Sequence, residues 1–200
     1  MTYRRELVYD PVLRLIHAWN LLTILLLLLT GLPREWLEPG QFYSVLRRFH
    51  LSLGDALILG LVGRLVWGLV GPKHARLTEL WRPRCWMSAL RQRRLFTAPE
   101  RFGHHGPATA AYLWVYGMLI GLSISGLALT AIKLGNGPFS NWLAYDMEWK
   151  APVTTIHEIL AYGVIAFIVL HLLALVVHHR RHGLPLAQSM VSGYQYLKEQ

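Results

Sequence analysis

Cysteine and charge are both scarce in this chain. Its 200 residues include one cysteine, Cys85, so no disulfide can form within the chain. Only 16% of the residues are charged, whereas an ordinary soluble domain has about 25%. The first ten residues also lack the pattern of a cleavable signal, because the apolar run that follows is too long and no small-residue cleavage site ends it. A disulfide-rich secreted protein is therefore excluded, and an ordinary soluble domain is disfavoured.

The chain contains long apolar runs. Hydrophobic residues make up 54% of the chain. Four segments, residues 15–32, 51–70, 108–132 and 153–178, are close to the length of about 20 residues that a helix needs to cross a hydrocarbon core. The alternative, a soluble all-helical protein with very apolar helices, explains these runs less well. We predict a single domain, residues 1–200, that folds as an all-α membrane protein with a four-helix transmembrane bundle.

Positive charge is distributed unevenly along the chain. Fourteen Lys and Arg residues lie in the N-terminal arm, the 71–107 segment and the C-terminal tail, and five lie in the two loops on the opposite side. Cytoplasmic loops carry the excess of Lys and Arg, so we expect a multi-pass protein of the bacterial inner membrane with both termini cytoplasmic. Topology thus explains the net charge of +9, and no nucleic acid is expected as a partner.

Two further segments have the composition of membrane-surface anchors. Residues 81–96 combine aromatic and aliphatic side chains with five arginines, which is typical of an amphipathic helix on the inner face. Trp142, Tyr145 and Trp149 resemble an interfacial aromatic belt on the outer side.

Four histidines lie at matched depths in the apolar segments. His17 is near the inner end of the first segment, and His50 is at the outer start of the second. In the fourth segment His157 precedes His171 by 14 residues, which is ~21 Å of helix and a return to within about 40° of the same face. Ionisable side chains at membrane depth are costly and mark functional sites. We therefore pair His50 with His157 near the outer face, and His17 with His171 near the inner face.

Two histidine pairs at two depths match the needs of two haems. Haem iron takes axial imidazoles from opposite sides of its ring, and facing helices of a bundle supply them. The sequence has no C-x-x-C-H motif for covalent attachment, so such haems are b-type and held by coordination and packing. Because two histidines fill both axial positions, each haem would carry electrons rather than act on a gas.

Other roles also fit these histidines. Each one alone suits a hydrogen-bonded packing residue equally well, although four histidines at two matched levels suit that role poorly. Zinc or copper is a weaker alternative, since zinc usually takes three or four ligands and each level offers two. His178, two turns beyond His171, is a second candidate for the inner ligand.

Arg64, Arg14 and Gly54 complete the predicted cofactor sites. Arg64 lies inside the second segment at the inner level, where a buried arginine needs an anionic partner such as a haem propionate. Arg14, one turn before His17, would share that task; the alternative for Arg64 is an arginine that reaches the inner headgroups. Gly54, one turn after His50, leaves room for a flat macrocycle, although close helix packing explains it as well. The same two interpretations apply to other glycines: Gly60, Gly63, Gly117, Gly121 and Gly126.

A set of short motifs runs in order through nearly the whole chain. It comprises Asp10-Pro11 through Arg14-x-x-His17-x-Trp19, Thr30-Gly31, His50-x-x-x-Gly54, Arg64-x-x-Trp67-Gly68, the segments 71–76 and 190–193, and the spacing of His157 and His171. With these motifs the chain resembles the bacterial b-type cytochrome family that includes prokaryotic cytochrome b561 and the cytochrome b subunit of nickel–iron hydrogenases. The resemblance implies a four-helix diheme fold, with the four histidines at its ligand positions, and exchange of electrons with quinone. Some relatives carry a fifth helix, for which no apolar segment exists here, and the 71–107 segment is long and basic for the simplest members.

The expected function is transmembrane electron transfer through two haem b groups. A periplasmic cytochrome c or redox enzyme subunit would exchange electrons at the outer face, and quinone would do so in the membrane. One alternative is a stand-alone superoxide:quinone oxidoreductase, in which basic outer residues would steer the anion: Arg34, Arg47, Arg48, Lys133 and Lys150. Others are a metal-ion transporter or the membrane anchor subunit of a larger redox complex. Candidate partners are membrane lipid, quinone, the periplasmic protein and a second copy of the chain.

Overall fold

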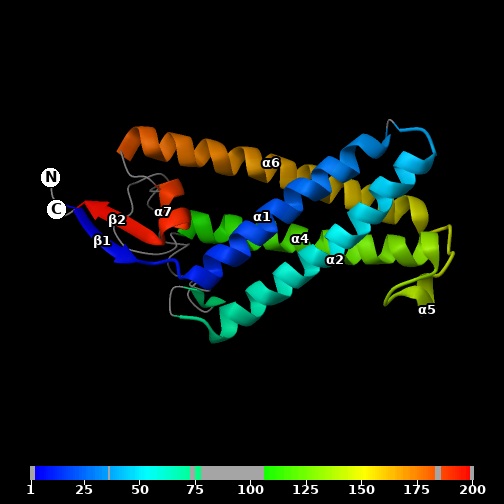
Figure 1. The fold of residues 1–200 in the computed structure, drawn as a ribbon, viewed down its shortest axis with the longest axis horizontal. Helices are drawn as coiled ribbons and strands as arrows, with labels where there is room; N and C mark the ends of the chain where they lie inside the picture. Colours follow the sequence, from blue (N-terminus) through cyan, green and yellow to red (C-terminus); the bar gives the residue numbers. More distant parts are fainter. Residues whose placement is uncertain (1–2, 36, 73–74, 78–105, 183–185, 199–200) are drawn as a thin grey trace. The chain divides into compact units, whose positions relative to one another are not determined.

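Four long helices make up most of the fold (Figure 1). The computed structural model describes residues 3–35, 37–72, 75–77, 106–182 and 186–198. The long helices are α1 (Pro11–Gly31), α2 (Gln41–Val70), α4 (Gly106–Leu134) and α6 (Lys150–His182). The shorter elements are β1 (Tyr3–Leu7), the 3-10 helix η1 (Leu32–Glu35), α5 (Ser140–Leu143), α7 (Leu186–Ser192) and β2 (Tyr194–Lys198).

The four long helices have the surface of membrane-spanning helices. Within the described residues, four helices are long and apolar enough to cross a membrane. They expose large apolar side chains at spacings of about one turn, such as Leu65 and Leu69 on α2 and Leu172 and Val176 on α6. Exposed apolar faces of this extent suit lipid rather than water. The prediction of an all-α membrane protein with four transmembrane helices is confirmed.

The helices extend beyond the apolar segments on which they were predicted. Helix α1 begins at Pro11 because Asp10 Oδ1 accepts hydrogen bonds from the N–H groups of Val12 and Leu13, both at 3.0 Å, and so caps the helix. Helix α2 begins at Gln41, well before residue 51. His50 therefore lies inside a continuous helix, where its backbone is fixed, rather than at a helix start.

Packing divides the chain into two compact units, and each long helix contributes a part to both. Unit 1 comprises Met1–Ala18, Val62–Trp114 and Ile168–Gln200. Unit 2 comprises Trp19–Leu61 and Val115–Phe167. The predicted pair His17 and His171 thus belongs to unit 1, and the predicted pair His50 and His157 belongs to unit 2.

In unit 1 the two ends of the chain pair with each other. Strands β1 and β2 form a two-stranded antiparallel sheet in which Leu7 pairs with Tyr194. Gly193 has a φ of +87° and turns the chain from α7 into β2, and its carbonyl accepts the N–H groups of Val8 and Tyr9 at 3.0 and 3.1 Å. A Cβ at Gly193 would lie 2.7 Å from the carbonyl oxygen of Tyr9, so this turn requires glycine. Sequence analysis predicted no strands, because a single pairing between distant chain ends leaves no hairpin signal.

A second contact in unit 1 joins the start of α1 to the end of α2. Trp67 Nε1 donates a hydrogen bond of 3.0 Å to Asp10 Oδ1, the same oxygen that caps α1. Just beyond α2, Arg76 Nε donates to the carbonyl of Gly71 at 2.9 Å. One carboxylate therefore fixes the first turn of one transmembrane helix against the last turn of another.

In unit 2, helices α1 and α2 approach closely at a glycine. Trp19 Nε1 donates a hydrogen bond of 2.8 Å to the carbonyl of Ala56. One turn further along α2, a Cβ at Gly60 would lie 2.0 Å from Asn20 Oδ1 and 2.7 Å from Trp19 Cδ1. Because no side chain fits in that space, Gly60 is a packing glycine.

Helices α4 and α6 also meet at glycines in unit 2. A Cβ at Gly121 would lie 2.8 Å from Leu160 Cδ1, and a Cβ at Gly163 would lie 2.8 Å from the sulfur of Met118. Each glycine therefore leaves room for a larger side chain of the facing helix.

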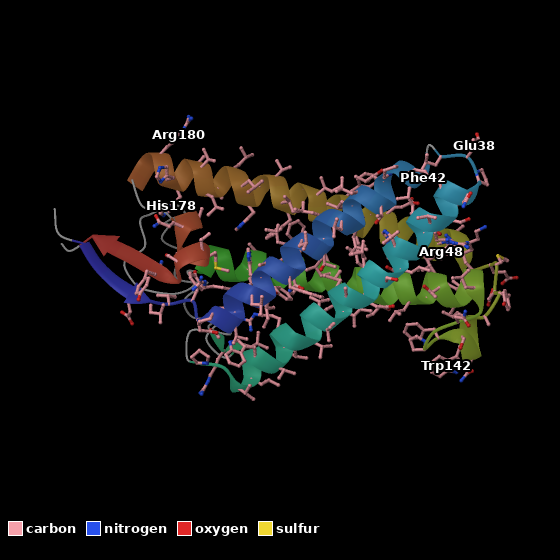
Figure 2. All side chains as sticks on the ribbon, viewed as in Figure 1. Glu38, Phe42, Arg48, Trp142, His178 and Arg180 are labelled. Atoms are coloured by element: carbon pink, nitrogen blue, oxygen red, sulfur yellow. The ribbon has the colours of Figure 1, made fainter. Side chains whose placement is uncertain are left out.

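The segment between α4 and α6 exposes the three aromatic residues predicted to form an interfacial belt. Trp142 on α5, labelled in Figure 2, is 75% exposed, and Tyr145 and Trp149 are also exposed. Their exposure is compatible with a position at the membrane interface, which stays a prediction. The predicted amphipathic segment, residues 81–96, lies outside the described residues.

Candidate functional site

His50 of α2 and His157 of α6 face each other in unit 2. Their ring centroids are 6.4 Å apart, and their ring planes cross at 68°. A metal–imidazole bond is about 2 Å long and the ring centre lies about 1 Å further on, so two imidazoles on opposite sides of one metal ion have centroids about 6 Å apart. The observed separation therefore suits a single iron between the two rings. Both side chains are half-buried.

A hydroxyl group contacts each of these imidazoles from a neighbouring helix. Thr30 Oγ1, near the end of α1, lies 3.1 Å from His50 Nδ1. Ser125 Oγ, on α4, lies 2.8 Å from His157 Nδ1. The two histidines are thus held by all four long helices: α2 and α6 carry the rings, and α1 and α4 carry the hydroxyl groups.

A glycine follows each hydroxyl residue and leaves space for the same imidazole. A Cβ at Gly31 would lie 3.0 Å from His50 Cε1, and a Cβ at Gly126 would lie 3.4 Å from His157 Cε1. The dipeptides Thr30-Gly31 and Ser125-Gly126 therefore provide one polar contact and one close approach for each ring. Sequence analysis noted Thr30-Gly31 as a motif and Gly126 as a small residue, but it gave neither hydroxyl a role. The repeated hydroxyl–glycine dipeptide is the signal that it missed.

The two other predicted ligands lie in unit 1. His17 of α1 and His171 of α6 are close enough for their charges to interact. Both side chains are exposed, in contrast to His50 and His157. His178, the second candidate for the inner ligand, is half-buried two turns further along α6. The structure thus places the predicted inner pair near each other.

Arg64 is a buried cation in unit 1. Its side chain is 3% exposed, and its Nε and Nη1 atoms have no hydrogen-bond partner among the described residues. The guanidinium carbon lies 5.4 Å from the centre of the Tyr112 ring, within the range of a cation–π contact. An aromatic face compensates only part of the cost of burying a charge, so these N–H groups suit an anionic partner. The burial is at odds with an arginine that reaches the headgroups.

Arg14 has a structural contact that the sequence did not predict. Its guanidinium donates a hydrogen bond to the backbone carbonyl of Val191, and it lies against Gly193. Arg14 thus links the first turn of α1 to the segment that joins α7 and β2. Its Nε is buried without a hydrogen-bond partner among the described residues, so the predicted role toward a propionate stays a prediction.

The structure separates the two interpretations of the small residues. Gly60 and Gly121 are explained by close helix packing, as described above. A Cβ at Gly54, in contrast, would meet no atom of the described residues within 4 Å apart from its own helix backbone, and the same holds for Gly63 and Gly117. Helix packing therefore gives no reason for glycine at position 54, one turn from His50. Close approach of a cofactor at that position stays a prediction.

The remaining candidates give little evidence for another kind of site. Within the described ranges, no group of three or more His, Cys, Asp or Glu side chains is placed to hold a metal ion. His74, His104 and His105 lie outside the described residues, and so does the side chain of His182. Among the basic residues considered for anion steering, Arg48 (Figure 2), Lys133 and Lys150 are exposed.

Comparison with known proteins places the whole length of the helical segment in one family. Residues 8–193 match the family described as "Prokaryotic cytochrome b561". The chain belongs to this family. Membership implies haem b as a cofactor and electron transfer at a membrane, which are the chemistry and the setting that the helices and imidazoles suit.

Several curated proteins are similar to this cytochrome over most of their length. Proteins named "Probable Ni/Fe-hydrogenase B-type cytochrome subunit" from Azotobacter chroococcum and Azotobacter vinelandii are 24% and 25% identical to it. A protein of the same name from Rhodobacter capsulatus is 24% identical. The alignments cover 96% of this chain and 82–89% of the relatives. No solved structure matches the chain.

Proposed function

We propose that this cytochrome transfers electrons across the bacterial inner membrane, between a periplasmic redox partner and the quinone pool, and that two bis-histidine haem b groups serve as its carriers. The observation that carries the proposal is the pair His50 and His157, whose rings come from two transmembrane helices and are separated by the width of one iron with its two bonds. When bound, the haems would supply one-electron redox chemistry. All other contributions come from the residues of the chain.

The residues of unit 2 would hold one haem. His50 and His157 would be its axial ligands, since both rings are oriented by a hydroxyl group and have glycine beside them. Gly54 would let a macrocycle approach α2, because no side chain of the described residues lies within 4 Å of the place where its Cβ would be. A haem held by both histidines would supply one-electron transfer rather than binding of a small gas.

The residues of unit 1 would hold the other haem. His17 and His171 would be its axial ligands, and Arg64 would donate hydrogen bonds to a propionate through the N–H groups that lack a partner. A guanidinium that pairs with a carboxylate recovers much of the free energy lost on burial. Arg14 would help from one turn before His17, where one of its nitrogen atoms already donates to the carbonyl of Val191.

The partners follow from topology and from the relatives. The excess of Lys and Arg in the arm, the 71–107 segment and the tail favours a cytoplasmic location for both termini, so the His50–His157 pair would lie toward the periplasm. The relatives are named as subunits of nickel–iron hydrogenases, which favours a redox enzyme subunit as the periplasmic partner. A soluble cytochrome c and a second copy of this chain are further partners within the same proposal.

The proposal is tested in proteoliposomes that contain the purified holoprotein and enclose ferricyanide, which does not cross the bilayer. Added duroquinol should reduce the haems and then the enclosed ferricyanide, with loss of its absorbance. His171→Ala should abolish this reaction, whereas His179→Ala, which changes an exposed histidine of the same helix, should leave it intact. Reduction of ferricyanide at equal rates with and without the protein would overturn the proposal, as would a purified protein without the reduced α band of six-coordinate haem b.

A further inference from the structure

Two hydroxyl groups in unit 2 form the same set of contacts around a histidine. Thr30 Oγ1 lies 2.8 Å from the carbonyl oxygen of Leu26 and 3.1 Å from His50 Nδ1. Ser125 Oγ lies 2.8 Å from the carbonyl oxygen of Gly121 and 2.8 Å from His157 Nδ1. In both cases the carbonyl belongs to the residue one turn earlier on the same helix.

The positions of the protons follow from these contacts. A hydroxyl group has one proton to donate, and a carbonyl oxygen can only accept. If the hydroxyl donated to the imidazole, its oxygen and the carbonyl oxygen would lie 2.8 Å apart with no proton between them. If it donates to the carbonyl, Nδ1–H of the imidazole donates to the hydroxyl oxygen and every contact is a hydrogen bond. The second arrangement leaves the lone pair of the imidazole on Nε2, the nitrogen at the far side of the ring.

We propose that Thr30 and Ser125 are positioning residues that fix His50 and His157 as Nε2 ligands and lower the reduction potential of the haem held between them. The proposal rests on the proposed function, because it assumes that these two rings ligate a haem. A hydrogen bond from Nδ1–H increases the basicity of the ligating nitrogen. A more basic ligand stabilises ferric over ferrous iron, so loss of the hydroxyl should raise the potential.

The glycines beside the two hydroxyl residues strengthen the argument. A Cβ at Gly31 would lie 3.0 Å from Cε1 and 3.4 Å from Nδ1 of His50, and a Cβ at Gly126 would lie 3.4 Å from Cε1 and 4.0 Å from Nδ1 of His157, so each glycine lies beside the Nδ1 edge of its ring. The hydroxyl and the glycine therefore contact the same edge of the ring, and they leave the Nε2 side free of both. A ring rotated by 180° would lose the hydrogen bond to its hydroxyl group.

The chain contains matched controls for both hydroxyl groups. Thr23 on α1 donates to the carbonyl of Trp19 at 2.7 Å, and Ser123 on α4 donates to the carbonyl of Leu119 at 2.9 Å. Both make the bond to the preceding turn that is common for Ser and Thr in helices, and in the described part of the chain neither has a histidine as a hydrogen-bond partner. Their removal tests the loss of a helix hydroxyl without the loss of an imidazole contact.

The test is a redox titration of the purified holoprotein, monitored at the haem α band and accompanied by a haem count. Thr30→Val and Ser125→Ala should each retain two haems and shift one of the two components to higher potential. We expect a threefold to tenfold change in the equilibrium constant for reduction, or ~30–60 mV at 59 mV per tenfold. Thr30→Ser and Ser125→Thr should return the potential toward that of the wild type, and Thr23→Val and Ser123→Ala should not shift it.

Each alternative outcome decides between the two proposals. If both haems are retained and Thr30→Val and Ser125→Ala match their controls, the positioning role is wrong and the ligand assignment stands. If Thr30→Val and Thr30→Ser lose haem to the same extent, Thr30 acts through packing and not through its hydroxyl group, and Ser125→Ala then gives the independent result for the second site. If the wild type itself contains no haem, the proposed function fails first.

Discussion

The imidazole planes of His50 and His157 cross at 68°, with ring centroids 6.4 Å apart. Nearly perpendicular axial imidazoles leave the iron d orbitals that interact with them close in energy, whereas parallel imidazoles split them. The haem bound by this pair should therefore give a highly anisotropic low-spin ferric EPR signal dominated by one low-field feature. The measurement is an EPR spectrum of the oxidised His17→Ala variant, which isolates this haem. A signal with three well-separated features would contradict the observed ring geometry.

Substitution of two glycines on α2 should affect haem binding for different reasons: one through the cofactor and the other through helix packing. Gly54→Leu should fold and insert normally, because a Cβ at this position meets no atom of the described residues outside its own helix within 4 Å and leucine favours a helix by up to about 1 kcal/mol over glycine. It should nevertheless lose one haem. Gly60→Ala should bind both haems poorly because its Cβ overlaps Asn20 and separates α1 from α2, a strain of about 1–3 kcal/mol. Haem-to-protein ratios and thermal unfolding in detergent distinguish the two effects.

The outcome at Gly54 has a clear meaning in either direction. Retention of two haems in Gly54→Leu would place the macrocycle away from that turn of α2. Loss of thermal stability before haem addition would show that the glycine is needed for packing after all.

Arg64 should set the potential of the haem in unit 1. Arg64→Met keeps most of the length of the side chain and removes a buried positive charge, since only 3% of the residue is exposed. A nearby cation stabilises the reduced form, so its loss should lower the potential of one component by about 60 mV, or tenfold in the equilibrium constant. Arg180→Met, at an exposed arginine of the same unit (Figure 2), is the control and should leave both components in place. An unchanged titration of Arg64→Met would exclude Arg64 as a partner of the haem.

The contact between Asp10 and Trp67 should contribute measurably to stability. Asp10→Ala removes the cap of α1 and the acceptor for Trp67 Nε1, and we expect a loss of about 2–3 kcal/mol. Trp67→Phe removes the hydrogen bond between the two helices and part of the indole ring but leaves the cap of α1 in place, and it should cost about 1 kcal/mol or slightly more. Asp10→Asn retains an acceptor oxygen and a good capping residue. The apparent unfolding temperature of the holoprotein should be highest for Asp10→Asn, lower for Trp67→Phe and lowest for Asp10→Ala. A stability of Asp10→Ala equal to that of Trp67→Phe would exclude the capping role.

The sequence was sufficient for the features that depend on helix periodicity and length. Apolar runs of about 20 residues predicted the four transmembrane helices, and the 14-residue spacing of His157 and His171 predicted that they face the same way. From these two facts the pairing of His50 with His157 follows, and the structure brings the two rings together. Their role as haem ligands stays a prediction.

The features that the sequence left out depend on contacts between distant segments. Thr30 and Thr23 are both threonines on α1 that donate to the carbonyl one turn earlier. Only the position of α2 beside α1 shows that Thr30 also contacts a histidine. The same applies to Ser125 and Ser123. The strand pair β1–β2 was missed because it joins residues at the two ends of the chain. The early start of α2 was missed because polar residues such as Arg47 and Arg48 interrupt the apolar run in its first turns.

Haem stoichiometry in single histidine variants tests the central claim most directly. The pyridine haemochrome assay on the purified wild type should give two haem b groups per polypeptide. His50→Ala and His157→Ala should each lose the same haem, and His17→Ala and His171→Ala should each lose the other, whereas His179→Ala should retain both. A wild type with one haem or none, or any of the four variants with both haems retained, would contradict the assignment of these histidines.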